Sequence, residues 1–429
     1  MAKKTAINYR LNCILLVFGR LVSEFGSSVF GFALSLYVLD FTNSAAAFSL
    51  VLSFSILPNM FVNLIAGSFV DKHDKKKTIV YTDILSGIAV LTFMLMFHLD
   101  PKSILLLISY KVILAITQSF FGLAVSTSIP NIVGASNTAR VNSISATLGS
   151  LVSILGPIVG AIAYKTIGLQ NIFLIDGISF ILSGISESFI VFEPKKAIEN
   201  KEHCMEQSSE KEKTNYLSGI KFGFQYILKD KTTSFFIFLA LLLNIVFSPL
   251  SALIIPYINY NVLEVSEVQL SIIQGSWAAG AIIGGCLMSI MKNTFFIIKR
   301  IFLLVQAQAI VLILFCFPNL NIPLFQSKWV ITFTFSFLLI LIGVLNVMQN
   351  VPLYTYFQLR VTEHLRGRVF AVFNITIMLS STLGLWIFGY ILDHVAWGNI
   401  LLASGIMMFL LGGVLNRNMY FKQFTTSIE

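Results

Sequence analysis

The chain has 429 residues, of which 56% are hydrophobic and only 11% are charged. Soluble chains carry about 25% charged residues, so this composition excludes a water-soluble enzyme. The net charge of +9 is compatible with a nucleic-acid partner. The basic residues, however, lie in short loops between apolar blocks, as they do in membrane proteins, and we expect no nucleic acid.

The apolar residues form blocks of the length that spans a bilayer, roughly 20 residues each. Each block must be a helix, because an unpaired backbone is too costly in hydrocarbon and the blocks do not alternate as barrel strands do. The sequence therefore predicts an all-α membrane protein with twelve helices, over residues 12–39, 45–70, 78–99, 103–126, 141–164, 171–192, 233–257, 268–291, 297–317, 329–350, 369–392 and 399–420.

The first span carries two charged groups at membrane depth, Arg20 and Glu24. They are four residues apart and share a helix face. Charged residues inside a membrane usually mark a transport site, so Glu24 is the strongest candidate for coupling or substrate recognition. The alternative is a self-neutralising pair that only fixes helix packing.

A glycine and an acid precede a basic cluster between the second and third spans. Gly67 and Asp71 stand at the end of the second span, and the cluster is Lys75, Lys76 and Lys77. Taken alone, this is equally well a tight turn followed by a basic loop on the inner side.

Two further charged residues lie in the next spans. Asp83 stands early in the third span, where we expect a structural ion pair with Arg140. Lys111 stands near the middle of the fourth span and is a second candidate for the transport site.

The fifth span has small residues about four apart, which favour close helix contact, and a proline that favours a kink. They are Gly149, Gly156, Pro157 and Gly160. Asp176 of the sixth span and Asp393 after the eleventh lie near the outer membrane surface, and Glu187 lies near the inner one; we expect exposed helix ends at all three.

A charged segment divides the chain. Residues 193–215 mix both signs of charge, which indicates a solvated linker, and 217–229 have helical spacing of apolar residues. The latter segment is either an interfacial amphipathic helix or an extension of the seventh span. The predicted domains are a bundle over 1–192, a cytoplasmic linker over 193–231 and a bundle over 232–429.

The two halves are related in sequence. Residues 140–184 align with 368–412 without a gap, with identical residues at pairs such as Gly156/Gly384, Gly177/Gly405 and Gly184/Gly412. The match predicts two six-helix bundles related by a parallel pseudo-two-fold repeat. In the second half, the candidate substrate contacts are Asn244, Asn346 and Gln349, and the eleventh span starts at Arg366 and Arg368.

The Gly67–Asp71 pair with its basic cluster resembles the loop signature of the major facilitator superfamily. The stretches LRGRVFAVFN (365–374) and IDGISF (175–180) and Asp83 resemble its drug-proton antiporter branch, which includes macrolide and enterobactin exporters. Lysines here replace the arginines usual in that loop, which keeps the charge but weakens bidentate pairing.

The resemblance implies roles for these residues. Asp71 would dock at Arg366 and Arg368 as a latch that holds an outward-open state. Spans 1, 4, 7 and 10 would line the central cavity, and the fifth span would match, in part, the antiporter signature of exporters.

The expected function is proton-coupled export of amphipathic drugs or natural products by alternating access. The alternatives are a narrow-substrate exporter, for example of siderophores, and a non-transporting sensor or immunity protein. We expect no enzymatic activity, cofactor or metal, because no nucleotide-binding loop, catalytic set or metal spacing occurs. The positive-inside bias predicts a multi-pass plasma-membrane protein, acting as a monomer among lipids, with both termini cytoplasmic.

Overall fold

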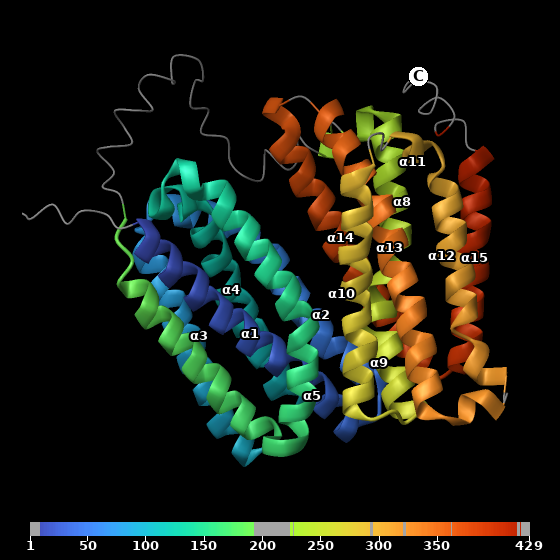
Figure 1. The fold of residues 1–429 in the computed structure, drawn as a ribbon, viewed down its shortest axis with the longest axis horizontal. Helices are drawn as coiled ribbons and strands as arrows, with labels where there is room; N and C mark the ends of the chain where they lie inside the picture. The colour runs from blue at the N-terminus through green and yellow to red at the C-terminus, as the bar shows by residue number, and fades with distance from the viewer. Residues whose placement is uncertain are drawn as a thin grey trace, which may run out of the picture. The chain divides into compact units, whose positions relative to one another are not determined.

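The computed structural model describes residues 9–192, 224–225, 227–291, 295–320, 323–361, 363–417 and 421. These residues are almost entirely helical (Figure 1). Within them, eleven helices are long and apolar enough to cross a membrane, and one of the eleven contains two spans. The prediction of twelve membrane helices is therefore confirmed.

The first half contains five long helices, two of which start with a capped end. Asp74 accepts a hydrogen bond from the Lys77 amide at the start of α3, and Ser103 accepts one from the Leu106 amide at the start of α4. The bounds are α1 Tyr9–Thr42, α2 Ala45–Lys72, α3 Lys75–Leu99, α4 Ile104–Val133 and α5 Ala135–Ser188.

The helix α5 is the one that holds two spans. Gly168 has φ +74° and ψ 164°, a backbone conformation that favours glycine, and the chain turns there (Figure 1). The spans predicted over 141–164 and 171–192 are thus the two parts of α5.

The second half begins with an irregular span. The helix α8, Lys231–Pro249, continues through π-helical turns at Leu250–Ile254 and Ile258–Val262, with the short α9, Ile255–Tyr257, between them. Pro249 and Pro256 lack the backbone N–H that a regular α-helix requires, which favours such wide turns. Sequence reasoning expected a regular helix here.

The remaining helices of the second half form packed pairs. The helix α10 packs along α13, α12 along α15, and α14 against α8 (Figure 1). Their bounds are α10 Glu267–Ile290, α11 Phe295–Lys299, α12 Ile301–Leu314, α13 Lys328–Arg360, α14 Glu363–Leu392 and α15 Trp397–Arg417.

The chain forms two compact units. Unit 1 contains residues 1–30, 58–152 and 167–218, and unit 2 contains residues 31–57, 153–166 and 219–429. The bundles predicted over 1–192 and 232–429 stay a prediction. The predicted linker and most of the predicted amphipathic segment lie outside the described residues.

Glycines let helices approach closely within each unit. In unit 1, a Cβ on Gly87 of α3 would lie 2.8 Å from the carbonyl oxygen of Gly177 in α5. In unit 2, a Cβ on Gly343 of α13 would lie 2.7 Å from the carbonyl oxygen of Trp277 in α10. Larger side chains at these positions would separate the helices.

Candidate transport site

Unit 2 contains a cavity of about 330 Å³ between α8, α10, α13 and α14. The structure brings the three predicted amides, Asn244, Asn346 and Gln349, to its wall. Asn244 lies on α8, whereas Asn346 and Gln349 lie on α13, and their positions in the sequence do not by themselves indicate that they line one cavity. The volume is within the range of small-molecule sites.

The rest of the wall is mainly aromatic and aliphatic. Trp277 lies on α10, Tyr354 and Phe357 on α13, and Phe373 on α14. Among the described residues that line the cavity, none carries a charged side chain. Such a wall binds the apolar body of a ligand and leaves orientation to a few polar groups.

The amides differ in how far their hydrogen bonds are satisfied. Asn350 Nδ2 donates to Asn346 Oδ1 at 2.8 Å, and Asn244 Nδ2 donates to the Ala240 carbonyl at 3.3 Å. Gln349 is buried, and its Oε1 has no hydrogen-bond partner among the described residues. A buried amide oxygen without a hydrogen bond costs free energy, so Gln349 Oε1 is the best candidate among these amides to accept a hydrogen bond from a ligand.

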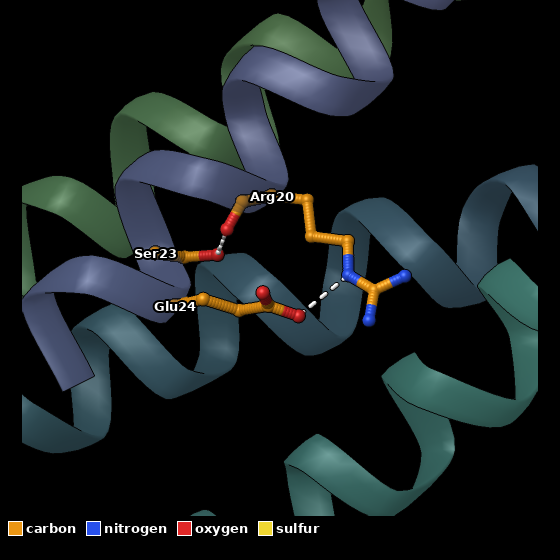
Figure 2. A network of polar contacts seen from close by, with 3 residues as sticks. All are labelled: Arg20, Ser23 and Glu24. Carbon is orange, nitrogen blue, oxygen red and sulfur yellow. Dashed lines mark hydrogen bonds and ion pairs between the residues drawn. The ribbon is translucent and has the colours of Figure 1, made fainter. Parts of the chain in front are cut away.

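Arg20 and Glu24 form an ion pair on α1 in unit 1 (Figure 2). Arg20 Nε donates to Glu24 Oε1 at 2.5 Å, and Ser23 Oγ donates to the Arg20 carbonyl at 3.2 Å. Both charged side chains are about one-third exposed, 35% and 37%. The predicted shared face is present, and neither group is sealed off from its surroundings.

Lys111 lies in a different environment of unit 1. Its Nζ stands 6.0 Å from the centre of the Phe30 ring, which favours a weak cation–π contact. It also attracts the carboxylate of Asp176 electrostatically. Asp176 is 1% exposed, so the expectation of an exposed helix end at Asp176 is wrong.

The expected ion pair between Asp83 and Arg140 is not formed. Arg140 is exposed on α5, whereas Asp83 is fully buried and neither carboxylate oxygen has a hydrogen-bond partner among the described residues. Asp83 instead interacts electrostatically with Glu187, which is 1% exposed and therefore not the exposed helix end expected from the sequence. Helix packing, which hydropathy does not reveal, buries both acids.

The latch residues are only partly described. Gly67 and Asp71 fall within α2 and Arg366 within α14, but their side chains lie outside the described part of the structure. Lys75 Nζ donates to the Thr127 carbonyl at 3.2 Å, Lys76 is half-buried and Lys77 is exposed. Arg368 is half-buried, and the latch stays a prediction.

The glycines of the fifth span lie in the first part of α5. Gly156 and Gly160 are buried, and Gly149 and Pro157 are half-buried. Burial agrees with a role in helix contact, but their part in transport stays a prediction.

Within unit 2, an acid at the end of α14 caps another helix. Asp393 accepts hydrogen bonds from Ser44 Oγ at 2.7 Å, the Ala45 amide at 2.7 Å and the Ala46 amide at 3.1 Å. These amides are the first of α2, whose positive dipole end favours a carboxylate. Sequence reasoning expected Asp393 only as an exposed helix end; it is exposed, but its contact with α2, 349 positions away, has no local signal in the sequence.

Comparison with known proteins identifies the family. The Major Facilitator Superfamily model matches residues 16–385. The chain is 24% identical over 408 residues to macrolide efflux protein A of Streptococcus pyogenes, with 94% of each chain covered. It is 25% identical over 393 residues to the multidrug efflux pump Tap of Mycobacterium bovis, covering 88% of this chain and 86% of that protein.

Solved structures share the fold. The nucleoside transporter NupG superposes with a TM-score of 0.73 at 13% identity, covering 94% of this chain and 98% of that one. A bacterial homologue of the iron transporter ferroportin, in an inward-facing state, gives a TM-score of 0.71 at 14% identity, covering 97% and 98%. Because the family model matches most of the sequence and the fold agrees, this chain belongs to the Major Facilitator Superfamily.

Proposed function

We propose that the protein is a monomeric secondary transporter of the cell membrane that exports amphipathic, drug-sized molecules in exchange for protons. The observation that carries the proposal is the aromatic, uncharged cavity of unit 2 with its four amide side chains. It occurs in a chain similar along nearly its whole length to a macrolide efflux protein and a multidrug efflux pump. Both termini are cytoplasmic in this proposal, as the basic loops favour.

The cavity chemistry defines the substrate class. The apolar body of a substrate would pack against Trp277, Tyr354 and Phe373, where burial gives about 25 cal/mol per Å² of apolar surface. Gln349 would accept a hydrogen bond from a substrate hydroxyl or amine. A cavity wall without charges gives little affinity for strongly anionic cargo such as many siderophores, so the narrow-substrate alternative is less favoured.

Glu24 is the candidate proton carrier of this mechanism. The Glu24 carboxylate is partly exposed and accepts a hydrogen bond from Arg20 Nε. Protonation of Glu24 would therefore break the ion pair. Alternating access would expose this pair to the two sides in turn. The latch at Asp71 and the glycines of the fifth span would control that change.

The test is efflux of erythromycin from a pump-deficient host, with and without an uncoupler of the proton gradient. Gln349→Leu keeps the size of the side chain and removes the amide. A lost hydrogen bond of about 1 kcal/mol lowers affinity about fivefold, so the apparent KM for efflux should rise by that factor.

The matched control is Gln358→Leu, an exposed glutamine on the same helix. It should leave the KM unchanged. Export that ignores the uncoupler would contradict proton coupling, and equal KM values in the two variants would remove the cavity from the transport path.

A further inference from the structure

A stripe of polar side chains runs along one buried face of the second part of α5. Asp176, Ser179, Ser183 and Glu187 recur at intervals of three, four and four residues, which places them on one side of a helix. Their exposed fractions are 1%, 7%, 1% and 1%. The stripe covers about three turns, roughly 16 Å along the helix axis.

The helix α1 covers this stripe with glycines. A Cβ on Gly26 would lie 2.7 Å from Ser179 Oγ and 2.8 Å from Asp176 Oδ1. A Cβ on Gly19 would lie 3.2 Å from Ser183 Oγ. Side chains larger than glycine would collide with these polar atoms, so the glycines allow the close approach of α1 that keeps the stripe buried.

The inner end of the stripe brings two acids together. Asp83 of α3 and Glu187 interact electrostatically, and Ser183 lies beside both carboxyl groups. Among the described residues, none of the four carboxyl oxygens nor Ser183 Oγ has a hydrogen-bond partner, and neither acid has an ion-pair partner. The Ser183 side chain is 1% exposed, so it is as deeply buried as the two acids.

Two carboxylates cannot both stay ionised in such a place. Burial of an unpaired charge costs several kcal/mol, and the second negative charge adds repulsion to that cost. Carboxyl pairs of this kind share protons and titrate as a unit.

The other end of the stripe meets a positive charge. Asp176 is attracted electrostatically by Lys111 of α4. The Tyr110 hydroxyl interacts electrostatically with Asp176, and it is also buried without a hydrogen-bond partner in the described structure. The charged residues of α1, the helix that covers the stripe, are Arg10, Arg20, Glu24 and Asp40, of which Arg20 and Glu24 pair with each other. Among the described residues, no cation forms an ion pair with Asp83 or Glu187.

We propose that Asp83, Ser183 and Glu187 form a proton-binding site, in which the two carboxyl groups share one proton, and that the stripe connects this site to Asp176 and Lys111. In the singly protonated site, one acid keeps its O–H bond while the other is a carboxylate, and Ser183, which lies beside both groups, would turn its hydroxyl to donate to the carboxylate. When the inner end opens to water, the O–H bond breaks and the proton leaves to the cytoplasm. This proposal rests on proton-driven export and places a coupling site away from Glu24.

The first test reads protonation without transport. Infrared spectra of the purified protein at neutral pH should contain a C=O stretching band of protonated carboxyl groups. The double variant Asp83→Asn/Glu187→Gln should lose part of that band, and the control Glu264→Gln, a surface acid whose side chain is 81% exposed, should keep all of it. An unchanged band in the double variant overturns the proposal.

The second test separates coupling from structure in proteoliposomes. Glu187→Gln should lower erythromycin uptake driven by a pH gradient about tenfold, the effect of about 1.4 kcal/mol, while exchange of labelled for unlabelled erythromycin persists. Loss of exchange and of erythromycin binding together with uphill transport would show a structural role and overturn the proposal. If the wild-type protein carries out no uphill transport, the proposed function is contradicted. The infrared band would still show whether the two carboxyl groups share a proton.

Discussion

At the scale of single residues, charged groups inside the helices separate into three environments. Arg20 and Glu24 neutralise each other on one half-exposed helix face. Lys111 and Asp176 attract each other across two helices, and Asp83 and Glu187 form no ion pair with a cation in the described part of the chain. Because the cost of a buried charge depends on its partner, these groups differ in what they contribute to function.

The first prediction concerns Glu24. Glu24→Gln removes the charge that Arg20 now pairs with and removes the titratable group. We expect uphill, uncoupler-sensitive export of erythromycin to be abolished while binding to the purified protein persists. Efflux and binding measured on the same variant test both parts.

The double variant Arg20→Met/Glu24→Leu distinguishes a role of the ion pair in proton coupling from a role in helix packing. If the pair only fixes helix packing, two apolar residues of similar size should restore proton-driven transport, since replacing an ion pair by packed apolar groups is often neutral. Active uphill export by either variant would exclude Glu24 as an essential proton carrier.

Sequence reasoning found some of these residues and missed others for a physical reason. The four-residue spacing of Arg20 and Glu24 is a local property, and the ion pair is present. The burial of Asp176 and Glu187 depends on α1 and α3 covering one face of α5, which no local pattern encodes. The periodic spacing of Asp176, Ser179, Ser183 and Glu187 was the signal available in the sequence.

At the scale of helices, hydropathy was sufficient for most spans because a helix in hydrocarbon needs only length and apolar composition. It failed to identify the π-helical turns around α9, which depend on how the chain accommodates Pro249 and Pro256. Helix contacts add a further constraint, because α3 and α5 meet at a pair of glycines, Gly87 and Gly177.

The second prediction tests this glycine contact. Gly87→Ala places a Cβ against the Gly177 carbonyl and the Ile181 side chain, 2.8 and 2.6 Å away, and should destabilise unit 1 by about 1–3 kcal/mol. Thermal unfolding of the purified protein in detergent measures the effect.

Gly122→Ala is the matched control on α4. A Cβ there has no neighbour within 4 Å, so only the higher helix propensity of alanine should act. A Gly87→Ala protein as stable as Gly122→Ala would show that α3 and α5 separate without cost.

At the scale of the whole molecule, the distribution of basic residues is the basis for the orientation. The third prediction uses Cys204, which lies in the charged central segment outside the described residues. In a variant that keeps Cys204 as its single cysteine, an impermeant maleimide should label the protein only after cell lysis.

The control for orientation is a second single-cysteine variant with Glu264→Cys, at a loop position predicted to be outside. It should be labelled in intact cells, because Glu264 is strongly exposed. Labelling of Cys204 in intact cells would reverse the orientation and, with it, the assignment of an inner end to the stripe on α5.

The last prediction concerns a contact between α14 and α2 within unit 2. Asp393 joins the end of α14 to the first turn of α2 through three hydrogen bonds, and Ser49 of α2 packs against Gly389 of α14 in the next turn. Both segments lie in unit 2 and are predicted to face outside, so we expect this contact to stabilise a closed outer end. The sequence predicted a latch at Asp71 on the inner side and gave no indication of this one, since the contact depends on residues far apart in the chain.

Asp393→Asn keeps the side-chain shape but removes the carboxylate that complements the helix dipole. The lost interaction of about 1–2 kcal/mol should increase the population with an open outer end about 5- to 30-fold. In a cysteine-free background, Ser49→Cys reports the opening, because Ser49 is only 2% exposed in the structure. Its labelling by an impermeant maleimide should accelerate in Asp393→Asn and stay unchanged in Asp100→Asn, an exposed acid on another loop predicted to be outside. Equal labelling rates in both variants would mean that Asp393 only caps α2, and that closure of the outer end depends on the apolar and glycine contacts around Ser49.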